Sequence, residues 1–293
     1  MKTTVVTGAS TGIGHAVALR QARKGDRVWS LVRSLERSAD LIETAQKEGL
    51  ALTLLEADVT DPVATEAAFA QIHSESGHVD RLVNNAGMFL GSTLEATSFD
   101  ELVAMTEVNF LGAMRCIKEV LPRMRAAGSG VIACVTSQST QAIFPTWTAY
   151  AGSKCALEGA MEALAMETAD LGIRVVLVQP GITLTAMRGK IEPRENPAAY
   201  ERMLKRYRTI IAADRTESMA PDDVAREIEK ALDDDATPFR IRVGVDARRN
   251  IALRASVSDE EWTRLFGVED DEDFYATWIR LAGVPDPRTL VEG

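Results

Sequence analysis

Short apolar runs rich in β-branched residues alternate with longer amphipathic stretches through most of the 293-residue chain. The runs predict seven strands, at Thr3–Thr7, Val28–Val32, Leu52–Leu55, Arg81–Val83, Val131–Thr136, Val175–Val178 and Arg240–Val243. The stretches between them predict helices near 12–24, 35–48, 61–75, 99–127 and 150–171. Continuous apolar strands separated by helices indicate a parallel sheet that is covered on both faces. Since no repeat or linker divides the chain, we expect one α/β domain over 1–293.

Composition and charge narrow the class of protein. A net charge of -10 with 46% hydrophobic residues fits a domain with a full core and argues against a nucleic-acid partner. The three cysteines, Cys116, Cys134 and Cys155, have no paired spacing, which favours reduced thiols. No metal-ligand spacing joins the histidines, so no metal is expected. Without a signal peptide or a long apolar run, the sequence predicts a cytoplasmic protein with no transmembrane segment.

The turn after the first predicted strand is rich in glycine and opens the first predicted helix. Glycines at such a turn allow a pyrophosphate to approach the backbone at the positive end of the helix. A glycine cluster can also serve packing alone, but its place between strand and helix favours a dinucleotide. The candidate contacts in this turn are Gly8, Ser10, Thr11, Gly12, Ile13 and Gly14.

The ends of the next three strands carry further candidate cofactor contacts. Val32 stands where a ribose with free hydroxyls requires an acidic residue, and Arg33 follows it. This favours the 2′-phosphate of NADP(H), with NAD(H) possible and a merely solvated Arg33 as the alternative. Asp58 either accepts a hydrogen bond from adenine or caps the helix before Pro62. The fourth strand ends in Asn84-Asn85-Ala86-Gly87, whose adjacent amides need specific partners when they are buried.

Tyr150 and Lys154 are four residues apart, which places both side chains on one face of a helix. A cation about 4 Å from the phenol is worth up to roughly 4 kcal/mol at an effective dielectric of ~20. This would lower the tyrosine pKa from ~10 by about three units. Ser137 follows an apolar run and could hold a substrate oxygen against the same phenol. Because many helices carry this spacing by chance, the hypothesis depends on the other motifs.

Taken together, these motifs resemble those of the short-chain dehydrogenase/reductase family over about residues 1–190. Asn109 resembles the family's helix asparagine, and Pro180-Gly181-Ile182-Thr183-Leu184-Thr185 resembles its nicotinamide-side turn. The resemblance implies a Rossmann-type, doubly wound sheet of seven parallel strands, with the site at the carboxyl ends of the strands. It also implies cofactor contacts at Val59, Asn85, Ala86, Gly87, Pro180, Gly181, Thr183 and Thr185.

The same resemblance implies a role for each candidate catalytic residue. Tyr150 is the general acid or base for a secondary alcohol or ketone, and Lys154 lowers its pKa and binds the nicotinamide ribose. Ser137 holds and polarises the substrate oxygen. Asn109 supports a water in a proton relay, or else it is a structural helix residue. The implied reaction passes a hydride directly between the nicotinamide and the carbinol carbon.

The run from Pro145 to Gly159 resembles the branch that includes 17β-hydroxysteroid and retinol dehydrogenases. This implies a hydrophobic steroid-, retinoid- or aryl-like substrate, with Phe144 and Met187 in the pocket wall. A 3-oxoacyl-carrier reductase and a nucleotide-sensing protein without turnover are the alternatives. The acidic chain and its long tail weigh against the first, and the complete Ser/Tyr/Lys set weighs against the second. Family members assemble through two long helices, which implies a homodimer or homotetramer.

Beyond residue 190 the resemblance fades, and we expect a substrate lid, the last strand and C-terminal helices in 191–293. A helix over 200–211 carries an apolar face, predicted either to cover the pocket or to pack in the core. Its other face is basic, which predicts a solvated surface or a contact with a membrane or an anionic ligand. The residues of this basic face are Arg202, Lys205, Arg206 and Arg208. Further helices are expected over 221–234, 258–266 and 272–282.

Overall fold

The computed structural model describes residues 1–185 and 195–290 and contains one seven-stranded sheet. All paired strands are parallel, in the order β3-β2-β1-β4-β5-β6-β7. The strands are β1 (Thr3–Thr7), β2 (Arg27–Val32), β3 (Leu52–Glu56), β4 (Arg81–Asn84), β5 (Gly130–Val135), β6 (Ile173–Pro180) and β7 (Arg240–Val243). The predicted Rossmann-type fold and all seven predicted strands are confirmed.

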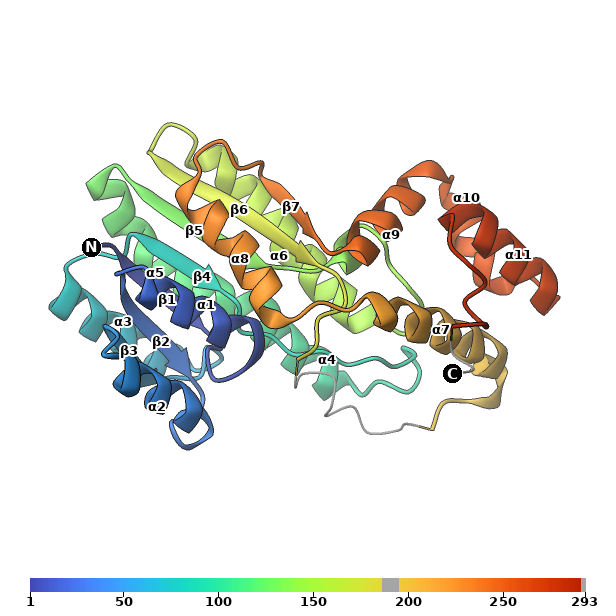
Figure 1. Cartoon of the computed structure of the whole chain (residues 1–293), viewed down its shortest axis with the longest axis horizontal. Coiled ribbons are helices and arrows are strands. Elements are labelled where there is room, and N and C mark those ends of the chain that lie inside the picture. Colours follow the sequence, from blue (N-terminus) through green and yellow to red (C-terminus); the bar gives the residue numbers. More distant parts are fainter. Residues whose placement is uncertain (186–194, 291–293) are drawn as a thin grey trace.

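Helices cover both faces of the sheet (Figure 1). They are α1 (Gly12–Arg23), α2 (Ala39–Glu48), α3 (Pro62–Ser76), α4 (Phe99–Thr106), α5 (Gly112–Ala127), α6 (Thr148–Glu167), α7 (Glu201–Asp214), α8 (Pro221–Asp233), α9 (Val245–Ser256), α10 (Asp259–Arg264) and α11 (Asp271–Ala282). Neighbouring residues of one strand enter opposite cores, since Val5 packs with α3, α5 and α6 and Val6 packs with α1 and α8. This explains why the strands are apolar throughout.

The chain order reverses where β1 lies between β2 and β4. In open parallel sheets, the crevice beyond the carboxyl ends of the strands at such a reversal is where ligands bind. The predicted helix over 99–127 is interrupted there by a π-helical turn at Glu107–Leu111, between α4 and α5. Such turns are common at functional sites because they redirect side chains within a helix.

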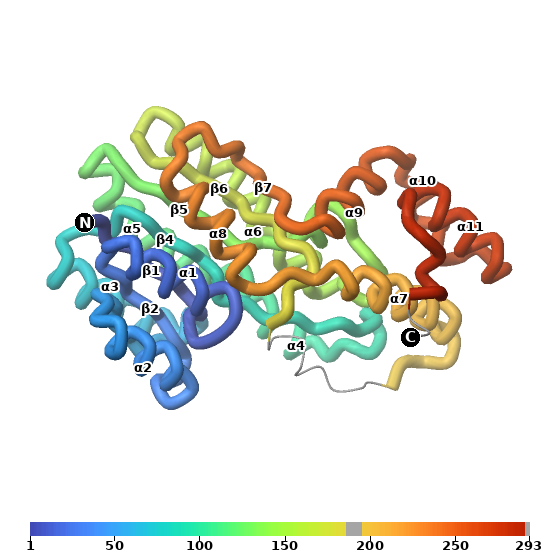
Figure 2. The backbone as a smooth tube through the Cα atoms, viewed as in Figure 1, coloured from blue at the N-terminus to red at the C-terminus, as the bar shows by residue number. Residues whose placement is uncertain are grey.

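The C-terminal helices form a second packed region, at the opposite end of the molecule from α2 and β3 (Figure 1). The tube in Figure 2 shows the chain leaving β7 and entering α9 directly. The sequence analysis missed α9, because its buried face mixes Asp246 and Asn250 with Ala247 and Ile251 and so lacks a clear apolar pattern. Within the described part of the chain, no helix has the length and apolar character needed to span a bilayer.

The structure corrects the prediction of a solvated basic face on α7 at one residue, since Arg202, Lys205 and Arg208 are exposed but Arg206 is not. Arg206 is fully buried: its Nε donates to Asp271 (2.8 Å), and its Nη1 donates to the carbonyl of Val268 (2.6 Å). Its guanidinium also lies 4.5 Å from the centre of the Phe274 ring. Arginine tolerates this burial because the carboxylate at the start of α11 and the carbonyl oxygens of the segment before it satisfy its donors.

At the amino ends of the strands, the buried Arg81 guanidinium donates to Asp26 (3.0 Å), Gln21 (3.0 Å) and Asp233 (2.6 Å). Arg81→Ala would leave the buried Asp26 carboxylate without its cation. We expect the free energy of unfolding to fall by about 3–5 kcal/mol, measured by urea denaturation. The partly exposed Arg27 is the control, and Arg27→Ala should cost about 1 kcal/mol or less. Equal losses in the two variants would contradict this account.

Candidate active site

A cavity of about 640 Å³ opens at the carboxyl ends of the strands. It brings together most of the residues that the sequence predicted for the site. These are Gly8, Ser10, Thr11, Gly12, Ile13, Arg33, Asp58, Val59, Asn85, Ala86, Gly87, Ser137, Tyr150, Lys154, Pro180, Gly181, Thr183 and Thr185. Gly14, Asn109 and Phe144 are predicted site residues that do not line it, and Met187 lies outside the described residues.

The glycine turn after β1 is held tightly against the turn after β4. The amides of Asn85 and Ala86 donate to Thr7 Oγ1 (3.0 Å each), and Asn85 Nδ2 donates to the carbonyls of Thr7 (3.0 Å) and Gly8 (3.1 Å). A Cβ on Gly14 would lie 2.6 Å from the Gly8 carbonyl oxygen, so only glycine fits this helix start. Asn85 thus fixes the two turns that line this part of the cavity against each other.

Two arginines lie at one end of the cavity, beside the carboxyl end of β2. Arg33 was predicted, whereas Arg37, in a short 3-10 turn before α2, was missed because it lies five residues beyond the end of the strand. Asp58 also lines the cavity, and its Oδ1 accepts from the amide (2.9 Å) and hydroxyl (2.8 Å) of Thr60. The alternative prediction, that Asp58 caps the next helix, is wrong, since Asp61 caps α3.

Lys154 is buried on α6, one turn after Tyr150, and its Nζ donates to the carbonyl of Val135 (2.9 Å). Burial lowers the pKa of Lys154 from 10.5 to about 8, against the opposing influence of Cys134 and Glu158. Its Nζ lies beside Gly87, where an added Cβ would be 3.5 Å away. The spacing of Tyr150 and Lys154 therefore does bring both side chains to one cavity.

Ser137 follows β5 and begins a 3-10 turn, where its Oγ accepts from the amide of Ser139 (3.1 Å). Asn109, in the π-helical turn, is engaged with its neighbours. Its Nδ2 donates to the carbonyl of Met88 (2.9 Å) and to Ser153 Oγ (3.0 Å), while its Oδ1 accepts from the Met88 amide (2.8 Å). Asn109 thus fixes the loop after β4 to α6.

Phe144 faces away from the cavity. It is 2% exposed and packs against Trp147 (ring centres 5.2 Å apart), Trp262 (5.7 Å) and Trp278 (5.9 Å). The prediction that it walls the pocket fails because the C-terminal helices, which the resemblance does not cover, supply aromatic partners on its other side. The apolar wall comes from residues that the sequence analysis missed, namely Met88, Phe89, Leu90 and Trp147.

The helix α7 supports this wall from outside. Trp147 Nε1 donates to the hydroxyl of Tyr207 (2.7 Å), and Ile210 and Ile211 are buried in the core of the C-terminal helices. The apolar face of α7 was predicted either to cover the pocket or to pack in the core. For these residues, core packing is confirmed. No α7 residue is among those described as lining the cavity.

Sequence comparison agrees with this geometry. The sequence model of the family described as short chain dehydrogenase matches residues 2–196 of this chain. The chain belongs to this family. It is 34% identical to glycine betaine reductase ATRR of Emericella nidulans over 79% of this chain, but spans only 17% of that protein. It is 32% identical to 3-ketodihydrosphingosine reductase of Bacteroides thetaiotaomicron (82% of this chain, 87% of that protein).

The predicted resemblance to the retinol dehydrogenase branch is confirmed by 32% identity to retinol dehydrogenase 8 of Bos taurus (87% of this chain, 85% of that protein). Among solved structures, a short-chain dehydrogenase from Streptomyces avermitilis has a TM-score of 0.79 at 32% identity, covering 90% of this chain and 96% of its own. An alcohol dehydrogenase from Thermococcus sibiricus, complexed with 5-hydroxy-NADP, has a TM-score of 0.70 at 26% identity, covering 83% and 96%. As in these relatives, the enzyme is an oxidoreductase of this family.

The buried ammonium of Lys154 gives a testable dependence of stability on pH. A lysine whose folded pKa is about 8 instead of 10.5 destabilises the fold fully below pH 8, and this penalty disappears as the pH rises through 10.5. In the absence of cofactor, the free energy of unfolding of Lys154→Met should therefore exceed that of wild type by the largest amount at pH 7. The difference in the free energy of unfolding should shrink by roughly 2–3 kcal/mol at pH 10. A difference that is independent of pH in urea denaturation would refute this.

Proposed function

We propose that this enzyme interconverts a secondary alcohol and a ketone on a hydrophobic substrate, with NADP(H) as the cofactor. The observation that carries the proposal is the convergence of Ser137, Tyr150 and Lys154 on one cavity that also contains the glycine turn. A binding protein without turnover has no use for this set, whereas a dehydrogenase needs all three.

The residues present fit a dinucleotide. The glycine turn lines the cavity with Gly12, where an added Cβ would lie 3.1 Å from Thr185 Cγ2, another atom of the lining, and it opens α1, whose positive end favours a pyrophosphate. Arg33 and Arg37 form a cationic end beside β2 that suits a 2′-phosphate. NADP in the structural relative from Thermococcus sibiricus supports the same choice here. NAD(H) lacks the 2′-phosphate that these two arginines would bind.

The chain's own residues hold the substrate and move one proton. Ser137 donates a hydrogen bond to the substrate oxygen, and the Tyr150 hydroxyl gives that oxygen its proton during reduction or takes it during oxidation. Protonated Lys154 stabilises the tyrosinate and binds ribose hydroxyls. The bound nicotinamide supplies or accepts the hydride. Asn109 positions the loop after β4, since its side-chain amide is hydrogen-bonded to Met88 and Ser153.

The wall of the cavity favours an apolar substrate body. Phe89 packs edge-on against Tyr150, with ring centres 4.8 Å apart, and it also packs against Trp147 at 6.4 Å. Together with Met88 and Leu90, these rings give the space next to the phenol an aromatic and aliphatic surface. The names of the relatives, retinol dehydrogenase and 3-ketodihydrosphingosine reductase, fit the same substrate class.

Two features of the sequence prediction belong to this proposal as well. The segment from 191 onward acts as a lid region, in which α7 supports the wall through Tyr207 and Trp147. Copies of the chain associate as a dimer or tetramer through the long helices α5 and α6. Neither feature is needed for the proton transfer itself.

Removal of the Tyr150 hydroxyl tests the reaction. With Tyr150→Phe, we expect kcat for ketone reduction to fall by about 10²–10⁴-fold, because the proton donor is lost. NADPH affinity should change little, and this is measured by fluorescence titration. A panel of aliphatic, aryl and steroidal ketones is assayed by NADPH oxidation. Undiminished turnover in the variant would exclude the mechanism, and cofactor binding without turnover in wild type would favour a sensor.

The cationic end of the cavity tests the choice of cofactor. Arg33→Ala should weaken NADPH binding by about tenfold or more, while NADH binding changes little, because only NADPH carries the 2′-phosphate. Arg37→Ala should act in the same direction. The exposed Lys47 on α2 is the matched control, and Lys47→Ala should alter neither affinity. Equal binding of the two cofactors by wild type would overturn this assignment.

A further inference from the structure

Asp246 is a fully buried carboxylate in the first turn of α9, directly after β7. Its Oδ2 accepts from the backbone amide of Ile182 (2.6 Å) and from Gln138 Nε2 (3.3 Å). Ile182 belongs to the turn after β6, and Gln138 directly follows Ser137. One carboxylate therefore bonds to both segments that flank the cavity, although it lies more than 60 residues away from each in the sequence.

The carboxylate fits because two glycines face it. A Cβ on Gly181 would overlap the Asp246 carboxylate, and a Cβ on Gly244 would lie 2.7 Å from Asp246 Oδ1. The Gly181 amide in turn donates to the carbonyl of Val243 (2.9 Å). Gly181, in the predicted nicotinamide-side turn, is therefore required for packing as well, because any side chain at this position would displace Asp246.

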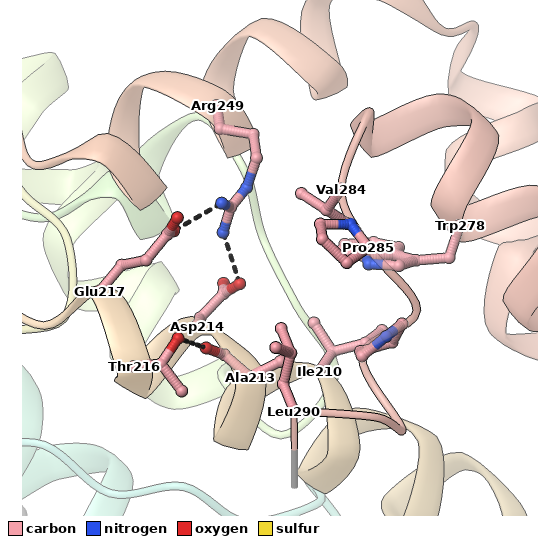
Figure 3. A pocket seen from close by; sticks show the side chains of 11 residues that line it. Ile210, Ala213, Asp214, Thr216, Glu217, Arg249, Trp278, Val284, Pro285 and Leu290 are labelled. Carbon is pink, nitrogen blue, oxygen red and sulfur yellow. Dashed lines mark hydrogen bonds and ion pairs between the residues drawn. The ribbon is translucent and has the colours of Figure 1, made fainter.

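A second arm extends from Gln138 to the end of α7. Gln138 Oε1 accepts from Asn250 Nδ2 (3.2 Å), which also donates to Asp214 Oδ2 (3.0 Å). Figure 3 shows the far end of this chain, where Arg249 pairs with Asp214 (2.6 Å) and with Glu217 (2.5 Å). The loop that carries Ser137 is therefore connected by buried polar side chains to α7 and α9.

Burial of the Asp246 carboxylate opposes folding, because the charged group loses its hydration. Burial raises the pKa of its carboxyl, and the hydrogen bond from the Ile182 amide opposes that rise. Asp214 is also buried but has Arg249 as its cation, whereas no ion pair to Asp246 occurs among residues 1–185 and 195–290. A buried carboxylate that has only neutral donors contributes little net stability. Asp246 instead fixes the relative positions of the two segments to which it is hydrogen-bonded.

We propose that Asp246 is a positioning residue, which fixes the serine loop and the turn at 181–183 relative to each other. In this position, the turn meets the nicotinamide side of the cavity while Ser137 meets the substrate oxygen. The inference rests on the proposed function of the cavity and extends it to a residue on an element that the dehydrogenase motifs do not include. Asn250 supports the serine loop only.

The test uses Asp246→Ala, which removes the carboxylate, and Asp246→Asn, whose amide oxygen can still accept from Ile182. Asn250→Ala removes the hydrogen bonds from Asn250 to Gln138 and Asp214 and leaves the bond between Gln138 and Asp246 in place. Asp26→Asn is the matched control, because Asp26 is a buried carboxylate at the opposite edge of the sheet, bound by Thr4 (2.7 Å) and Arg81 (3.0 Å). Each full-length variant is measured by thermal denaturation, by hydrogen exchange without cofactor, by NADPH titration and by ketone reduction.

For Asp246→Ala we expect exchange in 180–185 and in 136–141 to accelerate, NADPH Kd to rise about tenfold or more, and kcat to fall by a similar factor. Asp246→Asn should keep Kd within about threefold of wild type, because the hydrogen bond to Ile182 survives. Asn250→Ala should lower kcat and leave Kd unchanged. Asp26→Asn should lower the melting temperature and change neither Kd nor kcat.

The inference fails if folded Asp246→Ala keeps wild-type exchange, Kd and kcat, or if Asp246→Asn is as damaging as Asp246→Ala. Should Asp246→Ala not fold, Gln138→Ala decides, because it removes one of the two hydrogen bonds to Asp246 Oδ2. Faster exchange in 136–141 with lower kcat supports the inference, and wild-type exchange and kinetics overturn it. Failure of the proposed function has a different signature. In that case wild type itself binds neither NADPH nor NADH, while hydrogen exchange still reports whether Asp246 holds the two segments.

Discussion

The whole site depends on the parallel pairing of β1, β4, β5 and β6. Parallel strands all end at the same edge of the sheet, so the turns after Thr7, Asn84, Val135 and Pro180 meet there, although they are far apart in the sequence. The hydrogen bonds from Asn85 to the glycine turn fix two of these ends against each other. The cavity lies beside these four turns and extends to Arg33 after β2 and Asp58 after β3.

Buried polar groups then give this edge its detailed shape. Asn109 holds the loop after β4, Lys154 bonds to the end of β5, and Asp246 bonds to the turn after β6. Each group gives up solvation, and neither Lys154 nor Asp246 forms an ion pair among the described residues; both bond to backbone groups instead. The fold tolerates these groups because the apolar cores on both faces supply the stability.

Much of this arrangement could be predicted from the chain alone. The strands were identified because buried parallel strands are apolar without interruption, and the glycine turn, Ser137, Tyr150 and Lys154 were identified because their spacing is local and chemically specific. Asp246 and Asn250 gave no such signal, since a lone aspartate after a strand has many possible roles. Phe144 was misplaced for a related reason: its position along the chain was known, but the aromatic rings of the C-terminal helices on its other side were not.

The sequence by itself determined the fold class, the place of the glycine turn after β1 and the shared helix face of Tyr150 and Lys154, because periodicity and short spacings fix which side chains share a face or a turn. Only the tertiary structure decided which side chains line the cavity, that Arg206 is buried beside Asp271, and that one carboxylate joins the turns near Ser137 and Ile182. The hydrogen bonds among these contacts link residues that are 64 or more positions apart in the sequence. No local pattern encodes such contacts, since they arise only when separate elements pack together.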